Sequence, residues 1–436
     1  MREVAATGAA GKSLRAPDAQ TLAEKLIARA AGRTRVDAGE IVTCRVDLAM
    51  FHDSSGPRRL KPLLEDLGAS IWNRDRVVLV MDHYVPERDD DARRIVRIAR
   101  DWARDQALPH VYDSIGICHV VLPQRGHLRP GLFCVGGDSH STTGGAFGSY
   151  MFGIGSTEML GVLVTGEIWL RVPRTIRMHW DGRLQPGVHA KDMMLHMIGR
   201  FGMNGGRYQA VEYGGSAVRA LDMQDRMTLT NMSAELGAQT GLIEADEVTH
   251  EWLARTGAAA PEQGLWCSDD EACDERHEFN ADELGPQVAA PHSPSNVADV
   301  DRFGDVGIHV AYIGACTGAK LEDLAAAARV LRGRTIAAGV QLVVAPASVQ
   351  DQAEAEARGW MAALRDAGAQ VLSTGCGACA GYGGSIPDGA TVISSTARNF
   401  RGRMGGEAVD VYLASPATVA ASALRGRIAD PREVLA

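Results

Sequence analysis

The sequence predicts an α/β fold with parallel sheets, and three observations support this prediction. Between residues 308 and 373, short apolar runs alternate with leucine and alanine spacings typical of helices. Polar side chains follow the ends of several apolar runs, which is where open parallel sheets bind their ligands. The chain has 436 residues, too many for one ordinary domain, so we expect two to four.

The composition indicates a soluble metabolic protein. The net charge of -9, with no cluster of Lys or Arg, argues against a nucleic-acid surface. Eight irregularly spaced cysteines and no signal peptide predict a reducing compartment, and we expect a cytoplasmic location. No apolar run reaches the roughly 18 residues of a membrane span. Residues 1–19 are expected to be a flexible lead-in.

The first elements are a helix and a strand. Residues 21–33 predict an amphipathic helix that begins at Thr21, has Glu24 as the second half of a capping box, and ends at Gly32. Residues 41–56 then predict a strand that leads to His52 and Asp53. On pattern alone, a surface-loop histidine is the simpler interpretation of His52.

A purely apolar strand at residues 77–81 ends at Asp82 and His83. A carboxylate beside an imidazole can raise its pKa and keep it protonated, as a general acid requires. The alternative is a capping aspartate next to an exposed histidine.

The next segments carry polar groups in apolar or glycine-rich surroundings. His119 lies inside an apolar stretch, where a hydrogen-bonded core histidine is the simplest interpretation. Asp138, Ser139 and His140 then follow a strand and open a glycine-rich run whose backbone can approach a ligand closely. Three polar side chains together at a strand end favour a site over a simple turn.

The middle of the chain says less about function. Asn231 and Glu235 lie in a helical stretch, where a single glutamate is usually solvated. Residues 256–294 are acidic and rich in Pro and Gly, which predicts a surface excursion before a domain boundary. We assign no role to Cys267 and Cys273 within it.

Three further cysteines lie at strand ends of a predicted βαβαβ unit. Cys316 follows its first strand, and Cys376 and Cys379 form a CxxC pair after its last. Structural zinc requires four ligands, whereas an iron-sulfur cluster on three thiolates keeps an open position. A CxxC pair taken alone is equally compatible with packing or a redox pair. The final strand, at residues 390–394, is followed by Arg398 and Arg403, which could clamp carboxylates or lie on the surface.

Taken together, these motifs resemble the aconitase superfamily, and within it the large subunits of the isopropylmalate dehydratases. The resemblance extends from about residue 21 to the C-terminus through GDSHSTTGGAFG, FGIGSTE, NMSAELGA, IGACTG, the CGAC pair, RNFRGRMG and VYLASPATVAASAL. It implies three α/β domains of aconitase type packed around an iron-sulfur cluster, at residues 20–172, 173–300 and 301–436, without the swivelling domain.

The resemblance also implies the site. A 4Fe-4S cluster, one per chain, would be held by Cys316, Cys376 and Cys379. The implied acid–histidine pairs are Asp82 with His83, Asp138 with His119, and Glu235 with His140. The implied substrate contacts are His52, Ser139, Arg398 and Arg403. For His119 and Glu235 this replaces the structural interpretation given above.

The implied reaction is the dehydration and rehydration of a hydroxy dicarboxylic acid, most closely 2-isopropylmalate to 3-isopropylmalate in leucine biosynthesis. No segment after Arg403 resembles the swivelling domain that carries the catalytic serine, so a small partner subunit is expected to supply the base. Alternatives are a homoaconitase, a citraconate or dimethylmaleate hydratase, a specialised-metabolite paralogue, or a non-catalytic iron-sensing or RNA-binding relative. The chain departs from the family pattern at Ala397 and Gly318, where relatives carry asparagines beside the cluster.

Overall fold

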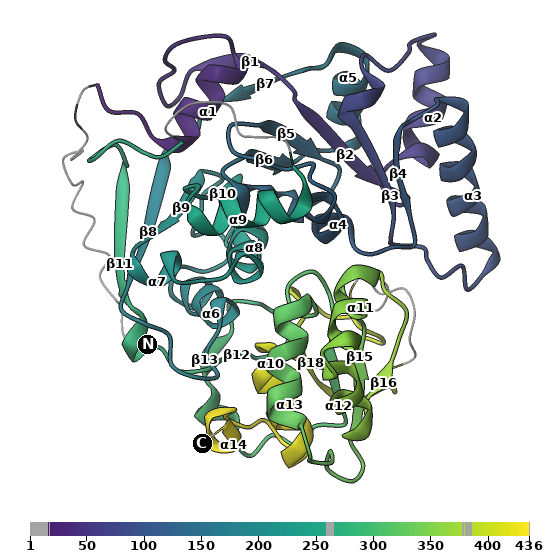
Figure 1. The fold of residues 1–436 in the computed structure, drawn as a ribbon, viewed down its shortest axis with the longest axis vertical. Coiled ribbons are helices and arrows are strands. Elements are labelled where there is room, and N and C mark those ends of the chain that lie inside the picture. The colour runs from purple at the N-terminus through teal and green to yellow at the C-terminus, as the bar shows by residue number, and fades with distance from the viewer. Residues whose placement is uncertain (1–15, 17, 259–265, 377–378, 380–385, 436) are drawn as a thin grey trace.

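The computed structural model describes residues 16, 18–258, 266–376, 379 and 386–435, and it confirms the α/β class. Most of the predicted lead-in lies outside the described residues. Three larger sheets follow one another along the chain, with a small two-stranded sheet beside the first (Figure 1). In the described part of the chain, no helix combines the length and the apolar character needed to cross a membrane.

The first sheet is parallel, with strand order β4-β3-β2-β5-β6. Its strands are β2 (Leu48–His52), β3 (Val77–Met81), β4 (His110–Asp113), β5 (Phe133–Gly136) and β6 (Tyr150–Gly153). Its helices are α2 (Pro57–Asp66), α3 (Asp90–Asp105), α4 (Cys118–Gln124) and α5 (Ser156–Thr165), with 3-10 helices η1 (Arg74–Arg76) and η2 (Ser139–Phe147). Every residue of β2 and β3 is buried, as expected for central strands covered on both faces.

The N-terminal helix begins as predicted, but the strand after it differs. Helix α1 (Leu22–Ala30) has Thr21 as its N-cap and a complete capping box with Glu24. Residues 41–52 form two strands rather than one: β1 (Ile41–Arg45) pairs with β7 (Glu167–Arg171), and β2 joins the first sheet. The break lies at Asp47, whose carboxylate pairs with Arg29 and accepts the backbone N–H of Phe133.

The second sheet is also parallel, with order β10-β9-β8-β11. Its strands are β8 (Thr175–Asp181), β9 (Ala210–Gly214), β10 (Thr240–Ile243) and β11 (Glu275–Asn280). Its helices are α6 (Ala190–Phe201), α7 (Ser216–Arg219), α8 (Met223–Asn231) and α9 (Glu247–Thr256), with η3 (Met232–Ala234) and η4 (Ala281–Glu283). Strand β11 lies in the stretch predicted to be a surface excursion. The strand does lie at the surface, because five of its six residues are exposed or partly exposed, but it pairs in register with β8 and so belongs to the edge of the sheet.

The third sheet is mixed, with order β13-β12-β18-β17-β14-β15-β16. Its strands are β12 (Gln287–Ala289), β13 (Val297–Asp299), β14 (Val310–Ile313), β15 (Gln341–Val344), β16 (Gln370–Val371), β17 (Thr391–Ser394) and β18 (Asp410–Leu413). Its helices are α10 (Leu321–Leu331), α11 (Val349–Ala357), α12 (Trp360–Asp366), α13 (Pro416–Arg425) and α14 (Arg432–Leu435), with η5 (Val300–Phe303).

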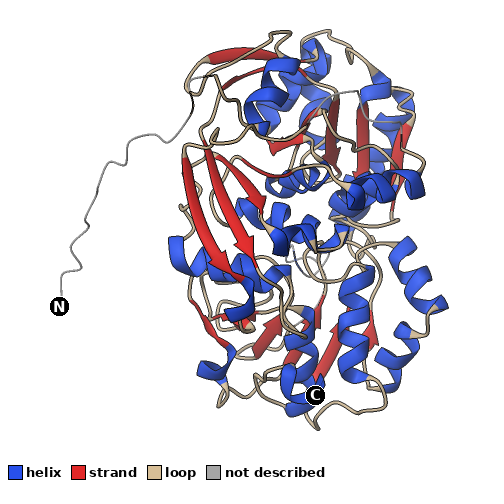
Figure 2. Cartoon of the chain, turned by 60° about the vertical axis from the view of Figure 1, so that its left-hand side comes forward, coloured by secondary structure: helices blue, strands red, loops and turns tan. Residues whose placement is uncertain are grey.

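The predicted βαβαβ unit is present in this third sheet, because β14, β15 and β16 are parallel neighbours. The second predicted helix is split into α11 and α12 at Gly359, whose φ of 73° is left-handed and ends the first segment. Strands β12 and β13 precede residue 301 yet pair into this sheet. Helices α10, α11, α12 and α13 cover the sheet in Figure 1, and Figure 2 shows the strands behind them.

The first and third sheets meet through loops at their strand ends. Gly116, before α4, bridges to Ser348, after β15, and the N–H of Ile117 donates to the carbonyl of Ala347. The N–H of Cys376 donates to the carbonyl oxygen of Asp82 across 2.8 Å. These contacts bring the polar residues that follow strands of the first sheet towards the cysteine loops of the third.

Candidate active site

The carboxyl end of β3 carries the first acid–histidine pair. Oδ1 of Asp82 lies 2.6 Å from Nδ1 of His83, and Oδ2 of Asp82 accepts the N–H of Cys118 at 2.7 Å. Asp53, at the end of the neighbouring β2, accepts the N–H groups of His83 and Tyr84 at 3.1 and 2.8 Å. The imidazole of His83 is therefore fixed by one carboxylate and its backbone by another.

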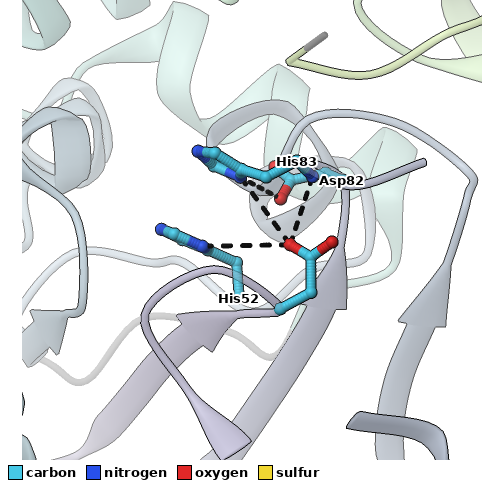
Figure 3. A group of neighbouring side chains, drawn as sticks. His52, Asp82 and His83 are labelled. Carbon is cyan, nitrogen blue, oxygen red and sulfur yellow. Dashed lines mark hydrogen bonds and ion pairs between the residues drawn. The ribbon is translucent and has the colours of Figure 1, made fainter. Parts of the chain in front are cut away.

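This environment keeps His83 protonated. Burial works against the imidazolium, but the contact and hydrogen bond with Asp82 raise the pKa of His83 to about 9. The same pair lowers the pKa of Asp82 to about 2, although burial acts in the opposite direction. The ring of His52 stacks on that of His83 with centroids 3.9 Å apart and 13° between planes (Figure 3). His83 is thus a buried cation held as an ion pair.

The second pair joins α4 to the end of β5. Nε2 of His119 lies 2.9 Å from Oδ1 of Asp138, and the same oxygen accepts the backbone N–H of His140 at 2.7 Å. Nε2 of His52 lies 3.7 Å from Oδ2 of Asp138. Burial opposes ionisation, yet these histidines hold the pKa of the Asp138 carboxyl well below its usual range. Asp138 is therefore an ionised carboxylate that interacts with the imidazoles of His119, His52 and His140.

The third pair connects the first two sheets and reaches the third. Oε1 of Glu235, which follows η3, lies 2.9 Å from Nε2 of His140 and accepts Nε–H of Arg398 at 2.7 Å. Arg398 also donates through Nη2 to Oγ of Ser139 at 2.8 Å. Oε2 of Glu235 is buried without a hydrogen-bond partner among the described residues. Glu235 is fully enclosed rather than solvated.

The thiols lie beside these pairs. All three predicted ligands are free cysteines. The thiols of Cys376 and Cys379 share a hydrogen bond, and burial together with the charge of Cys379 raises the pKa of Cys316 to about 12. Within the CxxC turn, residues 377 and 378 lie outside the described part of the chain. The structure thus brings Cys316 and the CxxC pair into one electrostatic neighbourhood.

Arg403 contributes a further cation near the thiols. Its Nε is buried and has no hydrogen-bond partner in the described part of the chain. The hydrogen bond with Cys376 and the charges of Arg403, His140 and Arg398 lower the pKa of Cys379 to about 6 against the effect of burial. Arg403 therefore faces the same region as Arg398.

Two residues of this site carry no distinct site signal in the sequence pattern. The pattern predicts Asp53 only as the end of a strand, whereas its carboxylate anchors the loop of His83. The pattern predicts Asn231 only as a helix residue, whereas its Nδ2 donates to Sγ of Cys316 at 3.2 Å and to Oγ1 of Thr143 at 2.8 Å. Its Oδ1 is buried and has no partner in the described chain. The one signal in the sequence is their position: Asp53 directly follows a mostly apolar strand, and Asn231 lies in a helical stretch that also carries apolar residues.

Comparison with known proteins gives a consistent result. The chain matches the Aconitase family (aconitate hydratase) over residues 24–306 and 300–426. It is 41% identical over 423 residues to 3-isopropylmalate dehydratase large subunit 1 of Methanopyrus kandleri, covering 95% of this chain and all of that protein. It is 40% identical to the probable methanogen homoaconitase large subunit of Methanothermobacter thermautotrophicus, covering 94% of this chain and 97% of that one. A large subunit 1 of 3-isopropylmalate dehydratase from Pyrococcus furiosus is 38% identical over 95% of this chain.

Proposed function

The chain belongs to the aconitase family, and on this basis we propose that it is the large catalytic subunit of a hydro-lyase. The proposed reaction dehydrates and rehydrates a hydroxy dicarboxylic acid, converting 2-isopropylmalate into 3-isopropylmalate. The observation that carries the proposal is the set of three histidine–carboxylate pairs, two of them buried and the pair at Asp138 partly buried, beside three thiols. Names of relatives that are about 40% identical over most of the chain support the substrate.

The residues present fit the 4Fe-4S cluster that the family implies. Three thiols, rather than four, gather on loops of the third sheet, and iron-sulfur clusters are held by thiolates. An amide N–H from Asn231 already points at Sγ of Cys316, as groups that tune such sulfurs do. Buried polar atoms of Asn231, Glu235 and Arg403 are without partners among the described residues. We propose Cys316, Cys376 and Cys379 as the ligands.

When bound, such a cluster supplies a Lewis acid with an open position for the substrate hydroxyl. The chain's own residues do the remaining work. His83 holds a proton at neutral pH and, backed by Asp82, is placed to deliver it to the leaving hydroxyl. Arg398, fixed by Glu235 and Ser139, and Arg403 provide planar, two-pronged partners for the substrate carboxylates.

His52 and Ser139 are proposed as further substrate contacts. Nε2 of His52 is buried without a hydrogen-bond partner in the described chain, although it lies near Asp138. Oγ of Ser139 accepts from Arg398, so its own proton is free to donate. The pairs His119–Asp138 and His140–Glu235 are proposed to orient and charge this wall of the site.

A small subunit is part of this proposal, because the relatives are named large subunits. We propose that the small subunit supplies the base that removes the proton from carbon. A homoaconitase is the second candidate, since one relative at 40% identity carries that name.

The deciding experiment is a substrate panel. The anaerobically reconstituted chain would be mixed with its cognate small subunit and given 2-isopropylmalate, homocitrate, citraconate and dimethylmaleate, with double-bond absorbance as the readout. Turnover of isopropylmalate above the others supports the proposal, and preference for homocitrate supports the second candidate. The chain without the small subunit is the control and should be inactive; full turnover by the chain alone would contradict the partner's role.

A further inference from the structure

Two buried lysines lie behind the loop that carries Cys316, and they differ in one respect. Nζ of Lys320 donates to the carbonyl of Cys316 at 3.1 Å and forms an ion pair with Asp323 at 2.7 Å. Nζ of Lys191, on α6, has no carboxylate oxygen within 4.0 Å in the described part of the chain. Lys191 is only 1% exposed. One buried cation therefore has its counter-ion, and the other does not.

The partners of Lys191 are all neutral. Its ammonium donates to the carbonyls of Ser395 and Thr396 at 2.5 and 2.7 Å, and to Oγ1 of Thr317 at 3.3 Å. The three N–H donors of the ammonium thus meet three acceptors, so its hydrogen bonds are satisfied. Among the described residues, however, no counter-ion within 4.0 Å balances its charge. Burying an ion without a counter-ion costs several kcal/mol, and buried charges are normally paired. Burial lowers the pKa of Lys191 to about 8, which agrees with this imbalance.

The position of Lys191 indicates which anion is missing. Thr317 directly follows Cys316, and Ser395 and Thr396 lead into Arg398. Asp323, Cys379 and Glu235 are the groups whose charges favour the ammonium form. Asp323 is already paired with Lys320, and Glu235 is already paired with Arg398 and His140. The thiol region of Cys379 is therefore the remaining source of negative charge. A substrate cannot supply the counter-ion, because the ammonium is buried and all its protons are engaged.

We propose that Lys191 is a positioning residue whose fixed charge compensates the negative charge of the thiolate-bound iron-sulfur cluster. This inference rests on the cluster of the proposed function. Three thiolates outweigh the positive charge of the iron-sulfur core, so a net negative charge lies in a low-dielectric interior, where a nearby fixed cation lowers its free energy. The same cation favours the reduced cluster, because reduction adds further negative charge. Its hydrogen bonds to Thr317 and Ser395 also fix the position of the Cys316 loop relative to the Arg398 loop.

The experiment compares four variants with the wild type, each as apo-protein and after anaerobic reconstitution. Lys191→Met removes the charge and the donors, Lys191→Gln removes the charge but keeps N–H donors, and Lys191→Arg keeps the charge. Lys320→Met is the matched control, because it removes an equally buried lysine that has its own counter-ion. The readouts are thermal unfolding, the rate of iron loss to a chelator, and the reduction potential of the cluster.

We expect Lys191→Met and Lys191→Gln to fold as apo-proteins. Their affinity for the cluster should fall about tenfold or more, which is the range seen for residues that support metal ligands. Their reduction potential should be lower than that of the wild type, and Lys191→Arg should restore it. Lys320→Met should instead destabilise the apo-protein, because it leaves Asp323 unpaired.

Two results would overturn the inference. One is that both Lys191→Met and Lys191→Gln fail to fold as apo-proteins. The inference gives the charge of Lys191 no role before the cluster binds, so removing that charge should leave the apo-protein folded. The other is an unchanged affinity and potential in variants that fold. Either would leave Lys191 as a structural support of the loops. A wild-type protein that binds no cluster would instead contradict the proposed function itself, so the two failures are distinguishable.

Discussion

The backbone N–H of Cys376 donates a 2.8 Å hydrogen bond to the carbonyl oxygen of Asp82. Asp82 ends a strand of the first sheet and pairs through its side chain with His83, whereas Cys376 belongs to a loop of the third sheet. One residue thus links the proposed acid to a proposed cluster ligand. Movement of the thiol loop would therefore change the position of the acid.

Asp82→Asn should shift the pH dependence of turnover. In the wild type, burial opposes the charged imidazole, but Asp82, with smaller contributions from Asp53 and Asp138, raises the pKa of His83 to about 9. His83 therefore keeps its proton through neutral pH and loses it as the pH passes about 9. An acid-dependent rate should therefore fall above pH 9. Removing the carboxylate lowers this pKa, so the alkaline limb should move to lower pH, with a loss of roughly 10²-fold or more in kcat. The profile of kcat against pH checks this; an alkaline limb that does not move would contradict the assignment.

Cys376→Ser should abolish the brown chromophore of the anaerobically reconstituted protein. The wild type is expected to hold about four irons and four sulfides, because thiolates are the ligands of such clusters. Iron and sulfide analysis, together with the visible spectrum, checks this. Cys44→Ser is the matched control, because Cys44 is also a buried free cysteine, and its thiol contacts the carbonyl of Ile27 in α1. A colourless wild type that binds zinc would overturn the cluster assignment.

Arg403→Lys should raise KM more than it lowers kcat. Nε of Arg403 is buried without a partner among the described residues, and an ammonium cannot replace a planar two-pronged fork towards a carboxylate. We expect KM to rise roughly tenfold, the effect of losing about 1.4 kcal/mol of binding. Arg401→Lys, at an exposed position two residues earlier, is the control and should be near wild type. Equal kinetics for the two variants would place Arg403 outside the substrate site.

Asp53→Ala should lower the free energy of unfolding. The Asp53 carboxylate accepts three backbone N–H groups, from Ser54, His83 and Tyr84, in a buried position. Leaving buried donors unpaired costs about 1–3 kcal/mol. Urea unfolding of the apo-protein measures the loss, and Asp90→Ala on the exposed start of α3 is the control. A change below about 0.5 kcal/mol, typical of surface substitutions, would show that the anchor is dispensable.

Much of the local structure was accessible from the sequence. The capping box of Thr21 and Glu24 and the parallel βαβαβ unit were both predicted and are confirmed. Asp82 and His83 were predicted at a strand end because they follow a purely apolar run, and they lie there. These features depend on neighbouring residues, whose spacing reports backbone conformation and burial. The division of residues 41–52 between two sheets was missed, because the turn at Asp47 depends on Arg29 and on the N–H of Phe133.

By itself, the sequence determined the elements and the chemical type of the side chains at their ends. Only the tertiary structure decided which ends meet. Glu235 and His140 lie 95 positions apart, and Lys191 meets only neutral acceptors in the described part of the chain because α6 packs against the loops of Cys316 and Arg398. Asp53 likewise acts as an anchor because β3 pairs with β2, and this pairing places the backbone N–H of His83 next to the Asp53 carboxylate. Periodicity describes one segment at a time, whereas hydrogen bonds and charge compensation depend on distances between segments.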